Sequence, residues 1–347
     1  MSNVPQPSVN REAVHLRWTG VCLGVAIGLS SVLVVSAKTP AREAAFTTID
    51  VPGAVVTFAT DISPAGDVVG RYIESIPNRP PPGSPIPGGH GFLLTGDRFA
   101  PIDFPAASFT IAQGIDSRGN IVGSYHDRDG KSHGFLLSGG VFSSIDFPGA
   151  IGTVALGINT PGDIVGTYTD TTGQYPWPTS HGFLLSGGVF SSIDFPGALI
   201  TTAWKINSAG QIVGRYKSLD GKFHIYLLCR HQGECSQSGQ LSPRSGSFTS
   251  IDFPGAFQTA TGVFGADGGI NPQGDLAGLY CSAPPCLINA AGHLHGFVLS
   301  GGEFTSFDFP GSVIATTATG INPRGDIVGA YRDPSGIVHS YLRRSAP

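Results

Sequence analysis

Histidine and aspartate recur together along this chain, and such a pair could act as a general base with the acid that orients it. The eighteen-residue segment His-Gly-Phe-Leu-Leu-Ser-Gly-Gly-Val-Phe-Ser-Ser-Ile-Asp-Phe-Pro-Gly-Ala occurs twice unchanged, beginning at His133 and at His181. A Gly-Gly pair tolerates the positive φ angles of a two-residue hairpin turn. With the glycines of the second copy in that turn, Ser186 pairs with Val189, and the same count places His181 opposite Asp194.

The same spacing predicts further pairs, because opposed side chains of an antiparallel hairpin lie close enough to hydrogen bond. Four pairs are thirteen residues apart: His90 with Asp103, His133 with Asp146, His181 with Asp194, and His295 with Asp308. Two more would come from His339 with Asp50, at opposite ends of the chain, and from His224 with Asp252, where an insertion at 229–246 replaces the tight turn. The insertion leaves that last pairing open.

These pairs have a catalytic and a structural interpretation. Histidine and aspartate are two of the three members of a Ser-His-Asp catalytic triad, so the pairs could be catalytic. However, a repeated scaffold has no use for six equivalent active sites, whereas every hairpin needs its strands in register, since a slip of one residue turns the apolar positions to the wrong face. We therefore interpret the pairs as structural hydrogen bonds.

Three markers recur six times in fixed order, and they predict a β-propeller. They are Ile-Asp-Phe-Pro-Gly, Asp-Ile-Val-Gly-x-Tyr and His-Gly-Phe-Leu-Leu, and the shortest unit, from Asp103 to Asp146, has 43 residues. Each unit holds four segments of strand length and composition, with an Asn-x-x-Gly turn between the first two. Four antiparallel strands in about 40 residues are typical of a propeller blade. We expect an all-β, six-bladed propeller of four-stranded blades over residues 46–347.

The order of the markers predicts how the ring closes. The repeats begin at Phe46 with the strand that elsewhere ends a unit, and they end at Leu342 without it. We therefore expect the N-terminal strand to pair in the last blade.

The markers resemble the HAF repeat family, bacterial repeats that are named for a His-Ala-Phe motif and predicted to be extracellular. The resemblance covers Phe46 to Leu342. The motif reads His-Gly-Phe in four units, His-Ile-Tyr at His224 and His-Ser-Tyr at His339, so its central alanine is absent throughout. The resemblance implies an exported repeat protein and no particular reaction.

Composition and the N-terminus limit the partners and the compartment. The net charge is -4 and no run of lysine or arginine occurs, which argues against nucleic acid. Residues 1–37 resemble a signal peptide cleaved after Ala37, followed by a linker at 38–45. The uncharged stretch Trp18 to Ala37 is also long enough for an uncleaved anchor, which would be the sole contact with a membrane. We expect a secreted, periplasmic or cell-surface protein.

Four cysteines remain after the signal segment, and an even number in an exported chain favours disulfides. Their spacing suggests Cys229 with Cys235 and Cys281 with Cys286. A zinc site that includes His231 is the alternative, although neither pair has the two-residue spacing of a zinc knuckle.

Residues that break the repeat are the better candidates for function. In a meander, the connections after Gly-x-Tyr and after Phe-Pro-Gly emerge on one end of the blades, here named the long-loop face; the Asn-x-x-Gly and Gly-Gly turns emerge on the other, the turn face. Long loops on a rigid scaffold commonly bind ligands. The candidate ligand-binding residues are Tyr175 and Trp177 in one such loop, Trp204 and Lys205 near the axis, and Arg71 and Arg215 after Val-Gly. Trp204 could instead fill a gap in the core.

Catalytic motifs are lacking. The chain contains no nucleophile elbow, zinc-protease helix, Walker loop or dinucleotide fingerprint. The Tyr-x-Asp triplets ending at Asp127, Asp170 and Asp333 precede a glycine that suits a β-turn. We expect a non-catalytic binding or scaffold module for a glycan or protein, with no metal and no cofactor. The alternative is a carbohydrate-active hydrolase or lyase at the channel mouth of the long-loop face.

Overall fold

The computed structural model describes residues 44–74, 89–170, 180–230, 247–261, 268–286, 293–311 and 315–345. Residues 42–347 form one compact unit. The predicted signal segment, Tyr175, Trp177 and Cys235 lie outside the described residues. No helix in the described ranges is long and apolar enough to cross a membrane.

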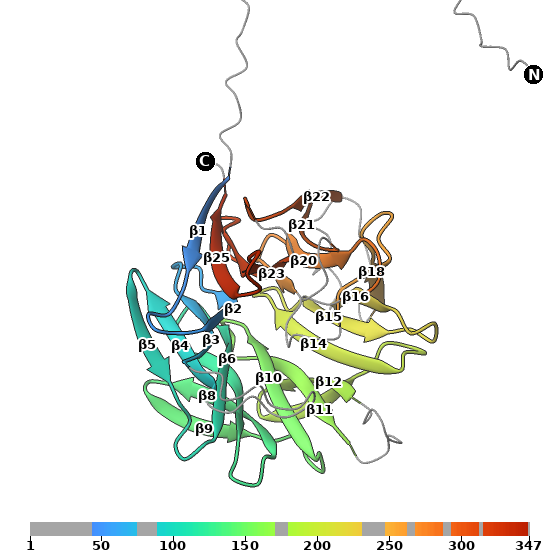
Figure 1. The fold of residues 1–347 in the computed structure, drawn as a ribbon. Coiled ribbons are helices and arrows are strands. Elements are labelled where there is room, and N and C mark those ends of the chain that lie inside the picture. The colour runs from blue at the N-terminus through green and yellow to red at the C-terminus, as the bar shows by residue number, and fades with distance from the viewer. Residues whose placement is uncertain are drawn as a thin grey trace, which may run out of the picture. The chain divides into compact units, whose positions relative to one another are not determined.

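Four separate antiparallel sheets of four strands each follow one another along the chain (Figure 1). Within each sheet the strands pair in chain order. The sheets are β2–β5 (Val56–Ile62, Val68–Ile73, Gly89–Thr95, Arg98–Ile102), β6–β9 (Phe109–Ile115, Ile121–His126, Ser132–Ser138, Val141–Ile145), β10–β13 (Gly152–Ile158, Ile164–Thr169, Ser180–Ser186, Val189–Ile193) and β14–β17 (Ile200–Ile206, Ile212–Lys217, Phe223–Cys229, Ser247–Ile251).

A nine-stranded sheet holds the two ends of the described chain. Its strands are β1 (Ala45–Ile49), β18 (Gln258–Thr259), β19 (Gly268–Ile270), β20 (Leu276–Cys281), β21 (Leu294–Ser300), β22 (Glu303–Phe307), β23 (Ala315–Ile321), β24 (Ile327–Arg332) and β25 (Val338–Arg344). One parallel bridge, Leu294 to Ala315, joins its two halves. In the second half β1 pairs antiparallel with β25, from Ala45 opposite Arg344 to Ile49 opposite Ser340.

The turns adopt the conformations that their sequences favour. Gly187 and Gly188 have φ angles of 58° and 80°, and the hairpin places Ser186 opposite Val189, which confirms the predicted register. In the Asn-x-x-Gly turn, Asn159 Oδ1 accepts hydrogen bonds from the N–H groups of Gly162 and Asp163. The local sequence therefore specifies where each strand begins and ends.

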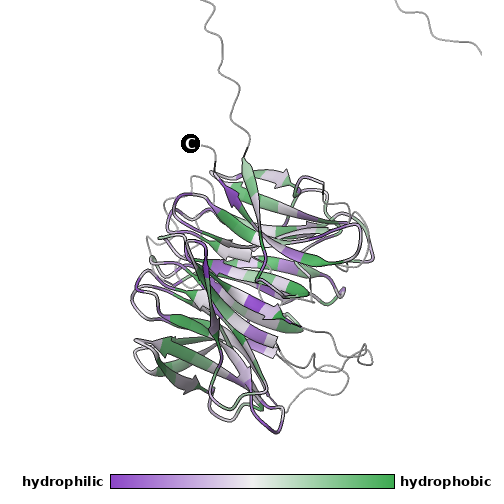
Figure 2. Cartoon of the chain, turned by 60° about the vertical axis from the view of Figure 1, so that its left-hand side comes forward, coloured by the Kyte–Doolittle hydropathy of each residue, from purple (hydrophilic) through white to green (hydrophobic). Residues whose placement is uncertain are grey.

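The core lies between successive sheets. Hydrophobic and hydrophilic residues alternate along the strands (Figure 2). The buried cluster between the first two sheets joins Ile102 of β5 to Ala112 of β6 and Phe135 of β8. The innermost strands contact one another in the order β2, β6, β10, β14, β19 and β23, and β23 also contacts β2. The chain is a β-propeller built from four-stranded antiparallel blades.

Two buried tyrosines occupy the position held elsewhere by Phe92, Phe135, Phe183 and Phe297. The hydroxyl of Tyr341 donates to the carbonyl of Thr317 at 2.7 Å. The hydroxyl of Tyr226 is buried without a hydrogen-bond partner among the described residues. Burial raises the pKa of both phenols, so both hydroxyls stay neutral.

We expect Tyr226→Phe to stabilise the fold by about 1 kcal/mol, because it removes a desolvated hydroxyl that gains nothing in return. Tyr341→Phe is the matched control and should cost about 1 kcal/mol, since it deletes a satisfied bond. Chemical denaturation measures both. Equal shifts of the two midpoints would contradict this account.

Candidate functional site

Each of the six histidines of the repeat lies against an aspartate. The Nδ1 to carboxylate distances are 2.8 Å for His90–Asp103, 2.7 Å for His133–Asp146, 2.6 Å for His181–Asp194, 2.6 Å for His224–Asp252, 3.1 Å for His295–Asp308 and 2.8 Å for His339–Asp50. The pair with the insertion, His224–Asp252, has the same arrangement as the others. The pair His339–Asp50 joins β25 to the residue that follows β1.

The aromatic neighbours of each histidine connect one blade to the next. His133 stacks on Tyr125, whose other face stacks on Phe104 at 3.6 Å between ring centroids. Phe104 follows Asp103 in the preceding blade. The hydroxyl groups of Tyr125 and Ser144 share a hydrogen bond. Four further blade junctions repeat the phenylalanine–tyrosine stack: Phe147–Tyr168, Phe195–Tyr216, Phe253–Tyr280 and Phe309–Tyr331. We call the histidine, aspartate, tyrosine and preceding phenylalanine the blade latch.

The Tyr-x-Asp carboxylates belong to the latch as well. Asp127 Oδ2 lies 3.2 Å from His133 Nε2, while its Oδ1 accepts the N–H groups of Asp129 and Lys131. The Lys131 N–H contributes most to lowering the pKa of Asp127, and His133 adds to it. Asp333 and His339 repeat this contact. These carboxylates are turn and latch residues, which accounts for them without glycoside chemistry.

We expect His133→Ala to lower the free energy of unfolding by about 1–2 kcal/mol, because it removes a stacked ring and a hydrogen bond to the half-exposed Asp146. The neighbouring Ser132→Ala is the control and should leave stability unchanged. Denaturant titration measures the difference, and an unchanged midpoint for His133→Ala would show that the latch does not hold the blades.

The innermost strands approach one another most closely at the repeat position just before the isoleucine of Gly-Ile-Asn. This position is glycine in four units: Gly114, Gly157, Gly269 and Gly320. A Cβ at Gly157 would lie 2.6 Å from the carbonyl oxygen of Trp204, and one at Gly320 would lie 2.9 Å from the Cα of Asp61. Neighbouring innermost strands therefore touch backbone to backbone at this level. The two units that depart from glycine carry Asp61 and Lys205.

Asp61 and Lys205 form a buried ion pair across the axis. Lys205 Nζ lies 3.0 Å from Asp61 Oδ2, and their side chains are only 6% and 14% exposed. The ammonium also donates to the carbonyls of Gln113 at 2.6 Å and Leu156 at 3.2 Å. Lys205 thus bridges three other blades. Burial lowers its pKa, and the carboxylate of Asp61 opposes that shift.

A small cavity opens above this pair on the turn face. It has a volume of about 110 Å³, is walled by the repeated isoleucines and has Asp61 and Lys205 in its lining. Asparagine side chains form a chain of hydrogen bonds from blade to blade. The Nδ2 amide of Asn159 donates to the backbone carbonyl of Asn207, that of Asn207 to the carbonyl of Asn271, and that of Asn271 to the carbonyl of Asn322. The asparagines of these turns therefore also link neighbouring blades.

Trp204 is a correction to the candidate ligand-binding set. Its side chain is fully buried in the core cluster with Leu156 and Phe297, so it cannot contact a ligand. It occupies a β-bulge: Ala203 pairs with Gly214 and Lys205 with Val213, and the extra residue between them turns into the space between blades. The core alternative for Trp204 is the correct one.

The two candidate arginines lie at equivalent positions of the first and fourth blades. Arg215 lies over the rings of Trp204 and Phe223, and its Nη1 donates to the carbonyl of Thr261 in the next blade. Arg71 lies over the ring of Phe58, and burial lowers its pKa. Trp204, Lys205 and Arg215 are thus close in space, whereas Arg71 belongs to another junction.

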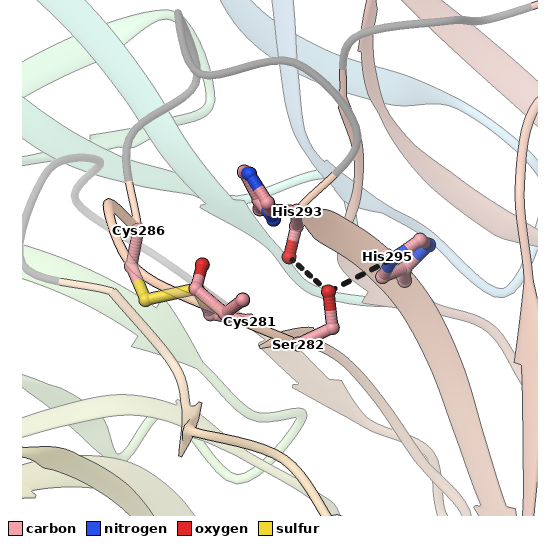
Figure 3. Close-up of a disulfide and its surroundings, with 6 residues drawn as sticks. Cys281, Ser282, Cys286, His293 and His295 are labelled. Atoms are coloured by element: carbon pink, nitrogen blue, oxygen red, sulfur yellow. Dashed lines mark hydrogen bonds between the residues drawn. A yellow bond between two sulfur atoms is a disulfide. The ribbon is translucent and has the colours of Figure 1, made fainter. Parts of the chain in front are cut away.

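The cysteine predictions fall partly within the described residues. Cys281 and Cys286 form a disulfide, as predicted (Figure 3). Beside it, the Ser282 hydroxyl contacts the carbonyl of His293 and Nε2 of the latch residue His295, each at 3.5 Å. Cys229 is also disulfide-bonded. In the part of the chain that the structure covers, no group of three His, Cys, Asp or Glu side chains could hold a metal ion.

Asp61 is the residue that our sequence reasoning missed. The signal was present, because the same repeat position that carries Lys205 carries Asp61 in the first unit. Two departures of opposite charge in one repeat position indicate a contact between them.

Solved structures with this fold are similar to the chain at low sequence identity. A protein described as TolB from Agrobacterium tumefaciens is 14% identical, with 84% of this chain and 90% of that chain covered and a TM-score of 0.50. A fucose-binding lectin from Aleuria aurantia, described as a six-bladed β-propeller, is 11% identical, with 85% and 93% covered and a TM-score of 0.45. No family model and no curated protein matches the chain. These likenesses concern the fold alone.

We expect Lys205→Met to cost about 3 kcal/mol, because it leaves the carboxylate of Asp61 buried without its partner. The double variant Lys205→Met/Asp61→Gly restores the glycine of the other blades at position 61 and should be more stable than Lys205→Met alone. Thermal and denaturant unfolding compare the two. A double variant that is less stable than the single one would contradict a buried charge as the cause.

Proposed function

We propose that the chain is an exported, non-catalytic six-bladed propeller, closed by its N-terminal strand, that binds a protein partner on its long-loop face. The distribution of exposed apolar side chains supports the choice of the long-loop face as the binding surface. Of eight large ones in the described ranges, six lie in connections on the long-loop face: Val55, Ile151, Leu199, Leu219, Phe257 and Ile337. Val141 and Val189 are on the turn face. Apolar side chains that gather on one face of a soluble protein mark interaction surfaces.

The chemistry of that face favours a protein over a glycan. Five of the six side chains are aliphatic, and sugar rings stack on aromatic ones. The latch aspartates lie in the same connections and are 40–51% exposed. A partner whose docking surface combines apolar side chains with lysine or arginine would complement both features.

The ring closure and the compartment are parts of the same proposal. Pairing of β1 with β25 and the contact of Asp50 with His339 support a sixth blade formed from both ends of the chain. The Cys281–Cys286 disulfide supports export, because such bonds persist in oxidising compartments. The resemblance of the repeat markers to the HAF repeat family is consistent with both.

The enzyme alternative requires acids that are free to react near the axis. Asp61 and Asp116 both line the axial cavity. Asp61 is bonded to Lys205 and to the N–H groups of Ile62 and Ile115. Three donors in the core thus contact its carboxylate. Asp116 accepts the N–H groups of Arg118 and Asn120. We therefore favour binding.

The test uses peptides selected from a displayed library on the intact chain. Leu199→Asp and Ile151→Asp, which place charges in the apolar surface, should each weaken the selected peptides at least about tenfold in calorimetry. The matched controls on the turn face, Val189→Asp and Val141→Asp, should leave the affinity unchanged.

Two results would contradict the proposal. One is affinity lost in the turn-face variants and kept in the long-loop-face variants. The other is a glycan array in which the chain binds a sugar through the long-loop face while the library yields no peptide.

A further inference from the structure

The ion pair at the axis brings an amine and a carboxyl group into direct contact. Lys205 Nζ and Asp61 Oδ2 are 3.0 Å apart, on blades that are half a ring apart in chain order. An ammonium and a carboxylate differ from an amide by one water molecule. Three features of the surroundings favour that conversion.

The first feature is the orientation of the amine. A neutral amine has two N–H donors and one lone pair. The carbonyls of Gln113 and Leu156 accept from Nζ at 2.6 Å and 3.2 Å. With both N–H groups directed to these carbonyls, the lone pair is left on the side of Asp61.

The second feature is the polarisation of the carboxyl group. The N–H of Ile62 donates to Oδ1 at 2.9 Å, and the N–H of Ile115 donates to Oδ2 at 3.2 Å. Both donors are backbone groups fixed by β2 and β6. Preorganised N–H donors on the oxygens of an acyl group stabilise the charge that develops when a nucleophile adds to its carbon.

The third feature is the low polarity of the surroundings. Burial disfavours the charged ammonium and lowers the pKa of Lys205, which favours the neutral amine. The neutral amine is the nucleophilic form of the side chain.

We propose that Lys205 and Asp61 join in an intramolecular isopeptide bond. The Nζ lone pair attacks Cγ of the protonated Asp61, the C–O bond to the hydroxyl breaks, and one proton from the amine leaves with that hydroxyl as water. The product is a secondary amide, and no oxidant or co-reactant takes part. The cavity on the turn face, which Asp61 and Lys205 line, gives the water a way out.

The bond would fasten the ring at its centre. It closes a covalent loop over residues 61–205, whereas the disulfide Cys281–Cys286 closes a loop with a sequence separation of 5. A crosslink over a long loop restricts the unfolded chain more than one over a short loop. An exported propeller without large hydrophobic helices would gain resistance to unfolding from it.

Peptide mass spectrometry of the purified full chain tests the proposal directly. Trypsin does not cleave after an amidated lysine, so we expect one branched peptide that contains both Asp61 and Lys205. Its mass equals that of the Asp61 peptide plus that of the peptide left uncleaved at Lys205, minus one water. Recovery of the two linear peptides alone, with Lys205 acetylated in full once the protein is denatured, would overturn the proposal.

Variants identify the bond and its origin. Lys205→Arg keeps the charge but removes the nucleophile, and Asp61→Ala removes the acyl group, so neither should give the branched peptide. An amide survives denaturant, so the wild-type chain should still give the branched peptide when it is fully denatured before digestion. A branched peptide in Lys205→Arg would assign the link to other residues and refute the proposed pair.

Discussion

The stacking of a phenylalanine from one blade on a tyrosine of the next is the interaction on which the ring depends. Backbone hydrogen bonds hold the strands within a blade, whereas neighbouring blades meet through side chains and through close backbone contacts at the axis. The centroid distances of the five such stacks fall between 3.6 and 3.8 Å. The histidine on the other face of each tyrosine, fixed by its aspartate, keeps the ring from turning away. The repeated polar residues therefore belong to the packing between blades.

The junction between the chain ends departs from this pattern. Val51 stands where the other units have phenylalanine, so Tyr72 stacks on His90 without a second ring. Another contact joins the two blades there: Ser340 Oγ accepts a hydrogen bond from the N–H of Ala59. The repeat has changed most where the chain begins and ends and at the axis, where Asp61 and Lys205 replace glycine.

The local sequence predicts the strands and hairpins of this fold well, but it predicts the contacts between blades poorly. The Gly-Gly turn specified the hairpin register, and the register placed His181 beside Asp194, because both follow from the period of a strand. The stack of Phe104 on Tyr125 joins residues of different blades and leaves no local pattern. The burial of Trp204 depended on a β-bulge at Ala203, which composition does not reveal. The contact of Asp61 with Lys205 required comparing two units that are far apart in the chain.

Nitrogen-resolved NMR of the imidazole rings tests the latch most directly, because it detects the proton on each ring nitrogen. If the latch holds the blades, all six repeat histidines carry a proton on Nδ1 that exchanges slowly with water, since each donates it to an aspartate. His126, which faces Phe109 outside the latch, serves as the internal reference. Latch histidines protonated on Nε2 alone, or exchanging as fast as His126, would contradict the account.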